Sequence, residues 1–182
     1  MEPFNFLDRP DKKRIKAIAE DYHYNVDSEA LDLYLELQRV FRETEKTYNR
    51  LFEKFDLSES RFTILMYLNR AKNHRLLVSE IARKLGVKKA TVSKLLKGME
   101  QQGLVTKRMS ETDKRATYVQ LTSQGNEKLK TFLPYNYKAV EQIFGTLTTK
   151  ERTQFSSLLK KLEDGNKNFE EMERKVDGNK EN

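Results

Sequence analysis

The chain contains no cysteine, and its 182 residues include only seven glycines and three prolines. Without cysteine it can form no disulfide, cysteine zinc site or thiol redox switch. The low glycine and proline content, an apolar fraction of 37% and a charged fraction of 35% favour a helix-rich soluble protein with long charged surfaces, or with much surface covered by a partner. Apolar runs are short, because the longest, residues 64–68, is far below the roughly 18 residues that span a bilayer. We therefore expect a cytoplasmic protein without a membrane partner.

Histidine is also scarce, and the usual catalytic motifs are missing. His23 and His74 are the only two histidines and lie far apart in the sequence, which argues against a transition-metal site. We find no Gly-rich phosphate loop, serine nucleophile elbow or HExxH motif. The acidic residues alternate with lysines in helical patterns, as on solvated faces. We therefore predict that the protein is not an enzyme, has no catalytic residues, and needs neither a metal nor another cofactor.

Positive charge, in contrast, is concentrated in one stretch. Residues 83–115 contain ten Lys or Arg and three Asp or Glu, which accounts for the whole net charge of +7. A surplus confined to so short a stretch is typical of a surface that meets a polyanion, although lysines can also form a merely solvated face. The leading candidate for a partner is therefore nucleic acid.

The same stretch has the pattern of two short helices joined by a tight turn. Residues 79–85 form a first helix that ends at Gly86, and a second helix runs from about 88 to 102 and ends at Gly103. This arrangement is a helix-turn-helix. Helical spacing directs four apolar residues of the second helix inward: Val92, Leu95, Leu96 and Met99. Lysines and hydroxyl residues of that helix must then point outward.

A β-hairpin with a charged tip follows. Residues 104–108 and 117–121 are rich in β-branched and apolar residues and enclose a polar stretch, 109–116. Helix, tight turn, helix and basic hairpin is the order of a winged helix-turn-helix. We therefore predict a mainly α fold with a small β-hairpin wing, a winged helix-turn-helix with N- and C-terminal dimerisation helices.

The flanking segments look like long helices that need a partner. Residues 29–55 carry apolar stripes on two sides, so two sides must be covered. A capping box at Thr148 and Glu151 begins a helix expected to bury Phe155, Leu158, Leu159 and Leu162, whereas Pro134 predicts a kink or break before it. We expect a homodimer. The predicted organisation is 1–28 as an N-terminal extension, 29–56 as a dimerisation helix, 57–122 as the DNA-binding domain, 123–176 as C-terminal dimerisation helices and 177–182 as a disordered tail.

Several short motifs resemble one family of regulators. Glu80-Ile81-Ala82, Leu85-Gly86-Val87, Asp113-Lys114-Arg115-Ala116 and Leu121-Thr122-Ser123-Gln124-Gly125 are similar to the MarR (multiple antibiotic resistance regulator) family of bacterial transcription factors. The resemblance covers roughly residues 29–165. It implies a homodimer that binds a pseudo-palindromic operator and is often released by a small molecule. We expect a transcriptional repressor, although the sequence alone does not separate repression from activation. One departure is Lys88, which stands where a helix-capping Ser, Asp or Thr is usual; a nearby phosphate would offset its charge.

Groove chemistry assigns roles to the candidate residues. Ser and Thr hydroxyls and Lys can contact base edges in the major groove, and further lysines meet phosphates. Arg115 at the hairpin tip is expected to enter the minor groove, with Asp113 either orienting it or forming only a surface ion pair worth about 0–1 kcal/mol. The predicted contacts to double-stranded DNA are Lys88, Lys89, Ala90, Thr91, Ser93, Lys94, Lys97, Lys107, Arg108, Asp113, Lys114 and Arg115.

Two alternatives stay open at this point. The winged helix could be a protein-contact module without an operator, although the basic stretch would then have no purpose. The aromatic residues Phe41, Tyr48, Phe52, Phe55 and Phe62 could line an effector pocket, but aromatics at helical spacing more often pack in a core or dimer interface. The residues that would bind an effector are therefore left unassigned.

Overall fold

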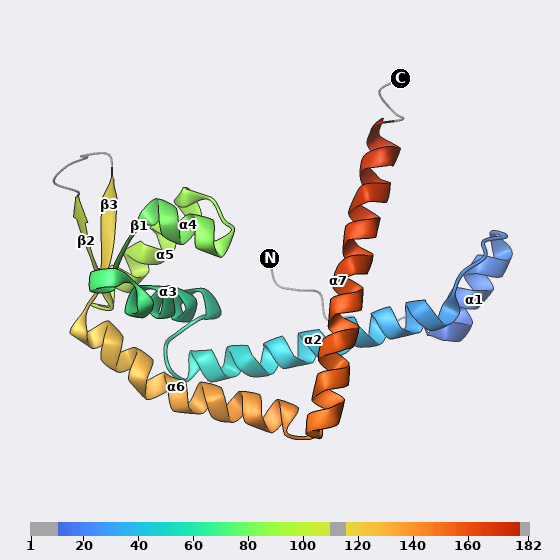
Figure 1. The fold of residues 1–182 in the computed structure, drawn as a ribbon, viewed down its shortest axis with the longest axis horizontal. Helices are drawn as coiled ribbons and strands as arrows, with labels where there is room; N and C mark the ends of the chain where they lie inside the picture. Colours follow the sequence, from blue (N-terminus) through green and yellow to red (C-terminus); the bar gives the residue numbers. More distant parts are fainter. Residues whose placement is uncertain (1–10, 110–115, 179–182) are drawn as a thin grey trace. The chain divides into compact units, whose positions relative to one another are not determined.

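The computed structural model describes residues 11–109 and 116–178, shown in Figure 1. The chain divides into two compact units, Met1–Leu121 and Thr122–Asn182, which are described separately. The predicted fold class is confirmed, since the elements are mainly helices with one small antiparallel sheet. None of the described helices is long and apolar enough to cross a membrane.

The first unit begins with two helices that contact each other, α1 (Lys12–Asp21) and α2 (Ser28–Glu53). Each helix begins at an aspartate that accepts backbone hydrogen bonds. Asp11 accepts one from Arg14 N at 2.9 Å. Asp27 accepts two, from Glu29 N and Ala30 N, both at 3.0 Å. These N-caps satisfy donors that the helices leave unpaired, so both boundaries are set by local sequence.

The rest of the first unit is the winged helix. Its elements are α3 (Glu59–Arg70), a 3₁₀ turn η1 (Lys72–His74), β1 (Arg75–Leu77), α4 (Val78–Leu85), α5 (Lys89–Gln101), β2 (Val105–Met109) and β3 (Thr117–Leu121). The sheet order is β1-β3-β2, with both pairs antiparallel. The sequence predicted the helix pair and the two hairpin strands within one or two residues, but not β1. The wing therefore has three strands at its base, with β3 in the middle.

A small apolar core holds these elements together. The side chains exposed by 1% or less include Ile64, Leu65 and Leu68 of α3, Ile81 of α4, Val92, Leu96 and Met99 of α5, Val105 of β2 and Val119 of β3. Burying each such side chain stabilises the fold by about 1.5–3 kcal/mol. The predicted inward face of α5 is confirmed at three of its four positions, and the fourth, Leu95, is half-buried. The core thereby fixes which face of α5 is presented to solvent.

The second unit consists of two long helices, α6 (Ser123–Phe144) and α7 (Thr149–Gly178). Of the kink or break predicted at Pro134, the break is not found, because α6 continues through this residue. Because Pro134 is exposed, water can solvate the carbonyl of Lys130, which lacks its usual helical donor. Thr122 begins α6 by accepting a hydrogen bond from Gly125 N at 2.9 Å.

The start of α7 matches the predicted capping box, but its expected burial is not found. Thr148 N donates to the Glu151 carboxylate at 2.7 Å, and Glu151 N donates to Thr148 Oγ1 at 3.3 Å. The four apolar residues that the sequence predicts to be buried, Phe155, Leu158, Leu159 and Leu162, are each exposed by 39–49% in the single chain. Within the second unit, none of the described residues buries this stripe. α7 also extends to Gly178, into the predicted tail, while 179–182 lie outside the described residues.

Candidate nucleic-acid interface

The turn between α4 and α5 is built on a glycine. Gly86 adopts a left-handed conformation with φ of 66°, and Val87 N donates to Ala82 O at 3.1 Å across the end of α4. A residue with a Cβ is strained in this conformation, so glycine is the favoured residue. At the other end of α4, Glu80 accepts a hydrogen bond of 2.7 Å from Leu77 N. Both ends of α4 are therefore fixed, and the turn delivers the chain directly into α5.

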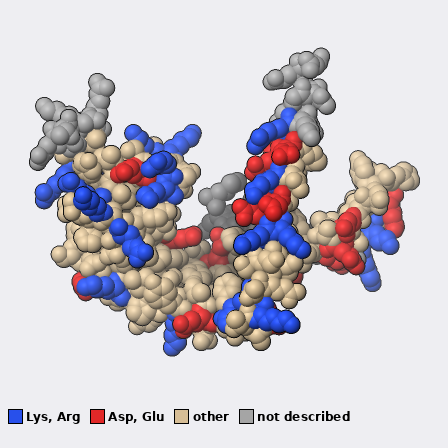
Figure 2. Space-filling model, viewed as in Figure 1, with Lys and Arg blue, Asp and Glu red and all other residues tan. Residues whose placement is uncertain are grey.

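The outward face of α5 carries most of the predicted contact residues. Lys89, Ala90, Thr91, Ser93, Lys94 and Lys97 are all exposed, on the side opposite the buried Val92, Leu96 and Met99, and Lys88 before the helix is exposed too. Figure 2 shows blue Lys and Arg side chains gathered over the part of the molecule that holds α4, α5 and the wing strands. The structure thus brings seven of the twelve predicted residues together on one face.

The N-terminus of α5 lacks the usual side-chain cap. Lys88 occupies the cap position without a side-chain hydrogen bond, and the first turn contains no acidic residue. A helix N-terminus carries a partial positive charge, and here two adjacent lysines increase it. This end of the helix therefore suits a phosphate group rather than a cation.

The wing begins where two further predicted residues lie. Arg108 in β2 pairs across the sheet with Tyr118, and the last described pair of the hairpin is Met109 with Thr117. Arg108 is exposed. The predicted tip residues Asp113, Lys114 and Arg115 lie outside the described residues, so their minor-groove and phosphate contacts remain predictions.

Lys107 has a contact that sequence reasoning missed. Its Nζ lies 3.1 Å from Oε2 of Glu100, and its backbone N–H donates to Oε1 of the same carboxylate at 3.2 Å. Glu100 belongs to α5 and Lys107 to β2, so one carboxylate ties the outward helix to the first strand of the wing. No local pattern signals this pair, because its members lie on different elements. The charge of Lys107, predicted to contact phosphate, is partly balanced within the protein.

Two further contacts support the helix-turn-helix from α3. Arg61 Nη1 donates to Gln102 Oε1 at 3.3 Å, which joins the start of α3 to the end of α5. The Tyr67 hydroxyl donates to Lys84 O at 3.2 Å, and Lys84 Nζ lies 5.4 Å from the centre of the Tyr67 ring. α3 is therefore the platform on which α4 and α5 are placed.

Aromatic packing links α2 to this platform. The Phe52 ring lies 6.1 Å from Tyr48 and 5.8 Å from Phe62, and Phe52 is only 5% exposed. Burial raises the pKa of the Tyr48 hydroxyl. Phe41, in contrast, is 61% exposed. The close contacts among Tyr48, Phe52 and Phe62 indicate that these rings pack against one another rather than line a ligand pocket.

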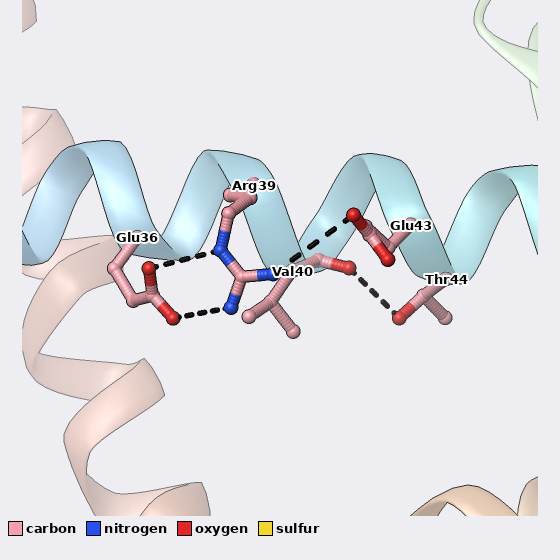
Figure 3. A network of polar contacts seen from close by, with 5 residues as sticks. All are labelled: Glu36, Arg39, Val40, Glu43 and Thr44. Carbon is pink, nitrogen blue, oxygen red and sulfur yellow. Dashed lines mark hydrogen bonds and ion pairs between the residues drawn. The ribbon is translucent and has the colours of Figure 1, made fainter. Parts of the chain in front are cut away.

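The exposed face of α2 carries a compensated set of charges, shown in Figure 3. Arg39 donates two hydrogen bonds to Glu36, at 3.0 and 2.6 Å, and its Nη1 lies 3.9 Å from Glu43. The hydrogen bond from Arg39 holds the pKa of Glu36 below its ordinary value. This face contains paired charges of both signs and is a solvated surface rather than a site for a polyanion.

Within the residues that the structure describes, no three His, Cys, Asp or Glu side chains are grouped so that they could hold a metal ion.

The fold, the geometry of the turn at Gly86 and the basic outward face of α5 define a winged helix-turn-helix protein. A sequence model of the MarR family matches residues 55–116. The HTH-type transcriptional repressor YetL of Bacillus subtilis (strain 168) is 34% identical over 150 residues, which cover 82% of this chain and 89% of YetL. The chain belongs to the MarR family.

Solved structures have the same fold. AbsC, a MarR family transcriptional regulator from Streptomyces coelicolor, matches with a TM-score of 0.67 and 23% identity over 79% of this chain and 97% of AbsC. Sco3205, a MarR family regulator from the same organism solved in complex with DNA, matches with a TM-score of 0.69 and 20% identity over 78% of this chain and 89% of Sco3205.

Proposed function

We propose that this protein is a DNA-binding transcriptional repressor that binds a pseudo-palindromic operator as a homodimer in the bacterial cytoplasm. The observation that carries this proposal is the outward face of α5, where seven predicted contact residues lie together within the one stretch that holds the net charge of +7. The family membership and the repressor YetL, similar over most of both chains, support the regulatory role.

In this proposal α5 enters the major groove of DNA. Its Thr91 and Ser93 hydroxyls and Lys89 contact base edges, while Lys94 and Lys97 contact phosphates. Lys88 and the uncapped N-terminus of the helix receive a further phosphate. Beyond the described residues, Arg115 enters the minor groove with Asp113 orienting it, and Lys114 and Arg108 reach the backbone.

The domain organisation follows from the same proposal. Residues 57–122 form the DNA-binding domain, and segments 29–56 and 123–176 form the dimer. Exposed apolar residues on α2 and α7 support this assignment, including Leu33 at 67%, Phe41 at 61% and Leu158 at 49%. A two-fold dimer places its two recognition helices in half-sites about 34–36 Å apart. Release by a small molecule, implied by the family resemblance, stays a prediction.

The test is the binding of purified protein to duplex DNA from upstream of its own gene and to a scrambled duplex. For a dimer that neutralises about 6–10 phosphates, affinity should fall about 10³- to 10⁵-fold between 50 and 200 mM salt. The upstream duplex should be bound more tightly than the scrambled duplex if the protein represses its own gene. A steep salt dependence with equal affinity for both duplexes would show that the protein binds DNA but that its operator lies at another place in the genome. If neither duplex is bound at low salt, the winged helix would instead be a protein-contact module without an operator.

A matched pair of lysine variants localises the interface. Lys97→Ala removes a predicted phosphate contact on α5 and should reduce the salt slope by about 2 for the dimer. Lys160→Ala removes the same charge from α7, in the other unit, and should leave the slope unchanged. Equal effects of the two substitutions would show that the affinity is non-specific charge attraction and would contradict the proposed interface.

A further inference from the structure

The wing sheet has one face turned toward the protein core and one turned toward solvent. Val119 in the middle strand β3 is fully buried, and its neighbours across the sheet are Leu76 in β1 and Lys107 in β2. Because side chains alternate along a strand, residues one step away lie on the opposite face. This outer face of the sheet carries Arg75, Leu77, Thr106, Arg108, Tyr118 and Gln120.

Two arginines flank one tyrosine on the outer face. Tyr118 pairs directly with Arg108 of β2, and Cζ of Arg75 lies 4.9 Å from the centre of the Tyr118 ring. A guanidinium stacked on an aromatic ring keeps N–H groups in its own plane that can donate to another molecule. Stacking also restricts the side chain before a partner arrives, which lowers the entropy lost on binding. Arg75 is thus a pre-ordered donor, although it lies outside the predicted contacts and outside the basic stretch 83–115.

The positive charges of the outer face lack acidic partners. Arg75 and Arg108 are both exposed, and neither forms an ion pair with any residue in the described ranges. Lys107 on the inner face differs, because its Nζ lies 3.1 Å from Glu100. The acidic residue nearest to Arg75 in the sequence, Glu80, already accepts a hydrogen bond from Leu77 N. Two uncompensated guanidiniums on one exposed face suit a polyanion.

The location of the outer face indicates that this polyanion is DNA. Arg108 is itself a predicted backbone contact, and it lies one residue pair from the last described pair of the hairpin, Met109 with Thr117. A surface continuous with that contact meets the same molecule. β3 separates β1 from β2, so the two arginine positions lie about 9–10 Å apart. Since phosphates recur about every 3.4 Å of axis along one DNA strand, the two arginines can bind different phosphates.

We propose that the outer face of the wing sheet is a second phosphate-binding surface, on which Arg75, stacked on Tyr118, contacts the DNA backbone together with Arg108. The inner face is turned toward α3 and α5, which contact β3 and β2. The outer face therefore meets DNA on the side of the wing that is away from α5, and its phosphates lie outside the base pairs that α5 contacts. Tyr118 is a positioning residue that acts through Arg75. This inference rests on the DNA binding of the proposed function.

Salt dependence tests the contact made by Arg75. In Arg75→Ala each protomer loses one phosphate contact, so the salt slope of the dimer should fall by about 2. Affinity should be on the order of 10- to 100-fold weaker at 50 mM salt, and this deficit should shrink about tenfold at 200 mM. The upstream and scrambled duplexes should show the same change, because phosphate contacts carry no sequence information. Arg75→Lys retains the charge and should retain the slope.

The control and the outcomes separate this inference from the proposed function. Arg50→Ala removes another exposed arginine, from α2, and should leave the slope unchanged. Equal effects of Arg50→Ala and Arg75→Ala would overturn the proposal. An unchanged slope in Arg75→Ala, with DNA binding intact, would overturn the outer-face contact alone and leave that face to an acidic protein. A wild-type protein that binds no DNA would overturn both.

Ethylation of DNA phosphates tests where the contact lies, because an ethylated phosphate has lost its charge. On the upstream duplex, ethylation should weaken binding of the wild-type protein at phosphates outside the half-sites as well as within them. Arg75→Ala should lose part of the outer signals and keep the inner ones. Outer signals that are absent from the wild type, or unchanged in Arg75→Ala, would overturn the proposed placement.

A double-mutant cycle tests the positioning role of Tyr118. Tyr118→Leu removes the aromatic ring and should weaken DNA binding on the order of 2- to 5-fold, with the salt slope retained because Arg75 stays charged. In the Arg75→Ala background the same substitution should have no further effect. Tyr118→Phe keeps the ring and should bind as the wild type does. Equal losses in both backgrounds would show a merely structural role and would overturn the positioning role.

Discussion

Glu100 offers a direct test of how the recognition helix and the wing are coupled. Its carboxylate makes both the ion pair and the backbone hydrogen bond to Lys107. Glu100→Gln keeps an acceptor for the backbone N–H and loses only the ion pair. Glu100→Ala loses both. Comparing the two substitutions separates the two interactions.

The expected losses of stability are modest because the pair is partly exposed. The Lys107 and Glu100 side chains are exposed by 26% and 42%, so the ion pair contributes at most about 1 kcal/mol. A backbone hydrogen bond contributes about 0.5–1.5 kcal/mol. We expect Glu100→Gln to lower the free energy of unfolding by about 0.2–1 kcal/mol and Glu100→Ala by about 1–2 kcal/mol. Urea unfolding followed by circular dichroism measures both.

DNA binding should change in the opposite direction. Without the carboxylate, Lys107 is free to bind phosphate, and one additional phosphate neutralised by each protomer should steepen the salt slope of the dimer by about 2. Affinity at low salt should therefore rise in both variants while stability falls. Glu45→Gln, which removes an exposed acidic charge from α2, is the control and should alter neither quantity.

Two results would refute this reasoning. Equal destabilisation by Glu100→Gln and Glu100→Ala would show that the backbone hydrogen bond contributes nothing. An unchanged salt slope in both variants would show that Lys107 lies out of reach of phosphate, and it would be removed from the predicted DNA-binding residues.

Three further predictions concern single positions. Gly86→Ala places a Cβ at φ of 66° and should destabilise the protein by about 1–2 kcal/mol; an unchanged urea midpoint would contradict the strained turn. Gly98→Ala should stabilise α5 by up to about 1 kcal/mol, because the added Cβ meets only the flexible end of Arg61, at 3.3 Å; a lower melting temperature would show that Arg61 cannot move. Hydrogen bonds from Thr148 lower the pKa of Glu151. Since a depressed folded-state pKa stabilises above the unfolded value, this contribution should be lost as pH falls through the lowered pKa, and Glu151→Gln should abolish that part of the pH dependence of unfolding.

Local signals explain what the sequence could predict. Gly86 follows the end of α4 and Gly103 follows the end of α5, and both adopt a positive φ. Buried positions at helical spacing set the orientation of α5, so the outward face could be assigned before the structure. The capping box of α7 is likewise a signal contained within four residues.

The features that were missed depend on distant parts of the chain. β1 is only three residues long, and its strand character comes from pairing with β3, for example Leu76 with Val119. The interaction between Glu100 and Lys107 exists only after α5 and β2 are brought together. The apolar stripe of α7 was predicted correctly as a stripe, but a pattern of apolar residues does not state whether its cover comes from the same chain or from another.

The missing cap at Lys88 affects when the first turn of α5 becomes fully ordered. The first turn of α5 lacks a side-chain acceptor in the free protein, so its amide hydrogens should exchange with solvent faster than those beside the buried Leu96 and Met99. A bound phosphate would supply the absent acceptor. The operator would then complete the helix that reads it, and protection of these few amides would report on occupancy of the binding site.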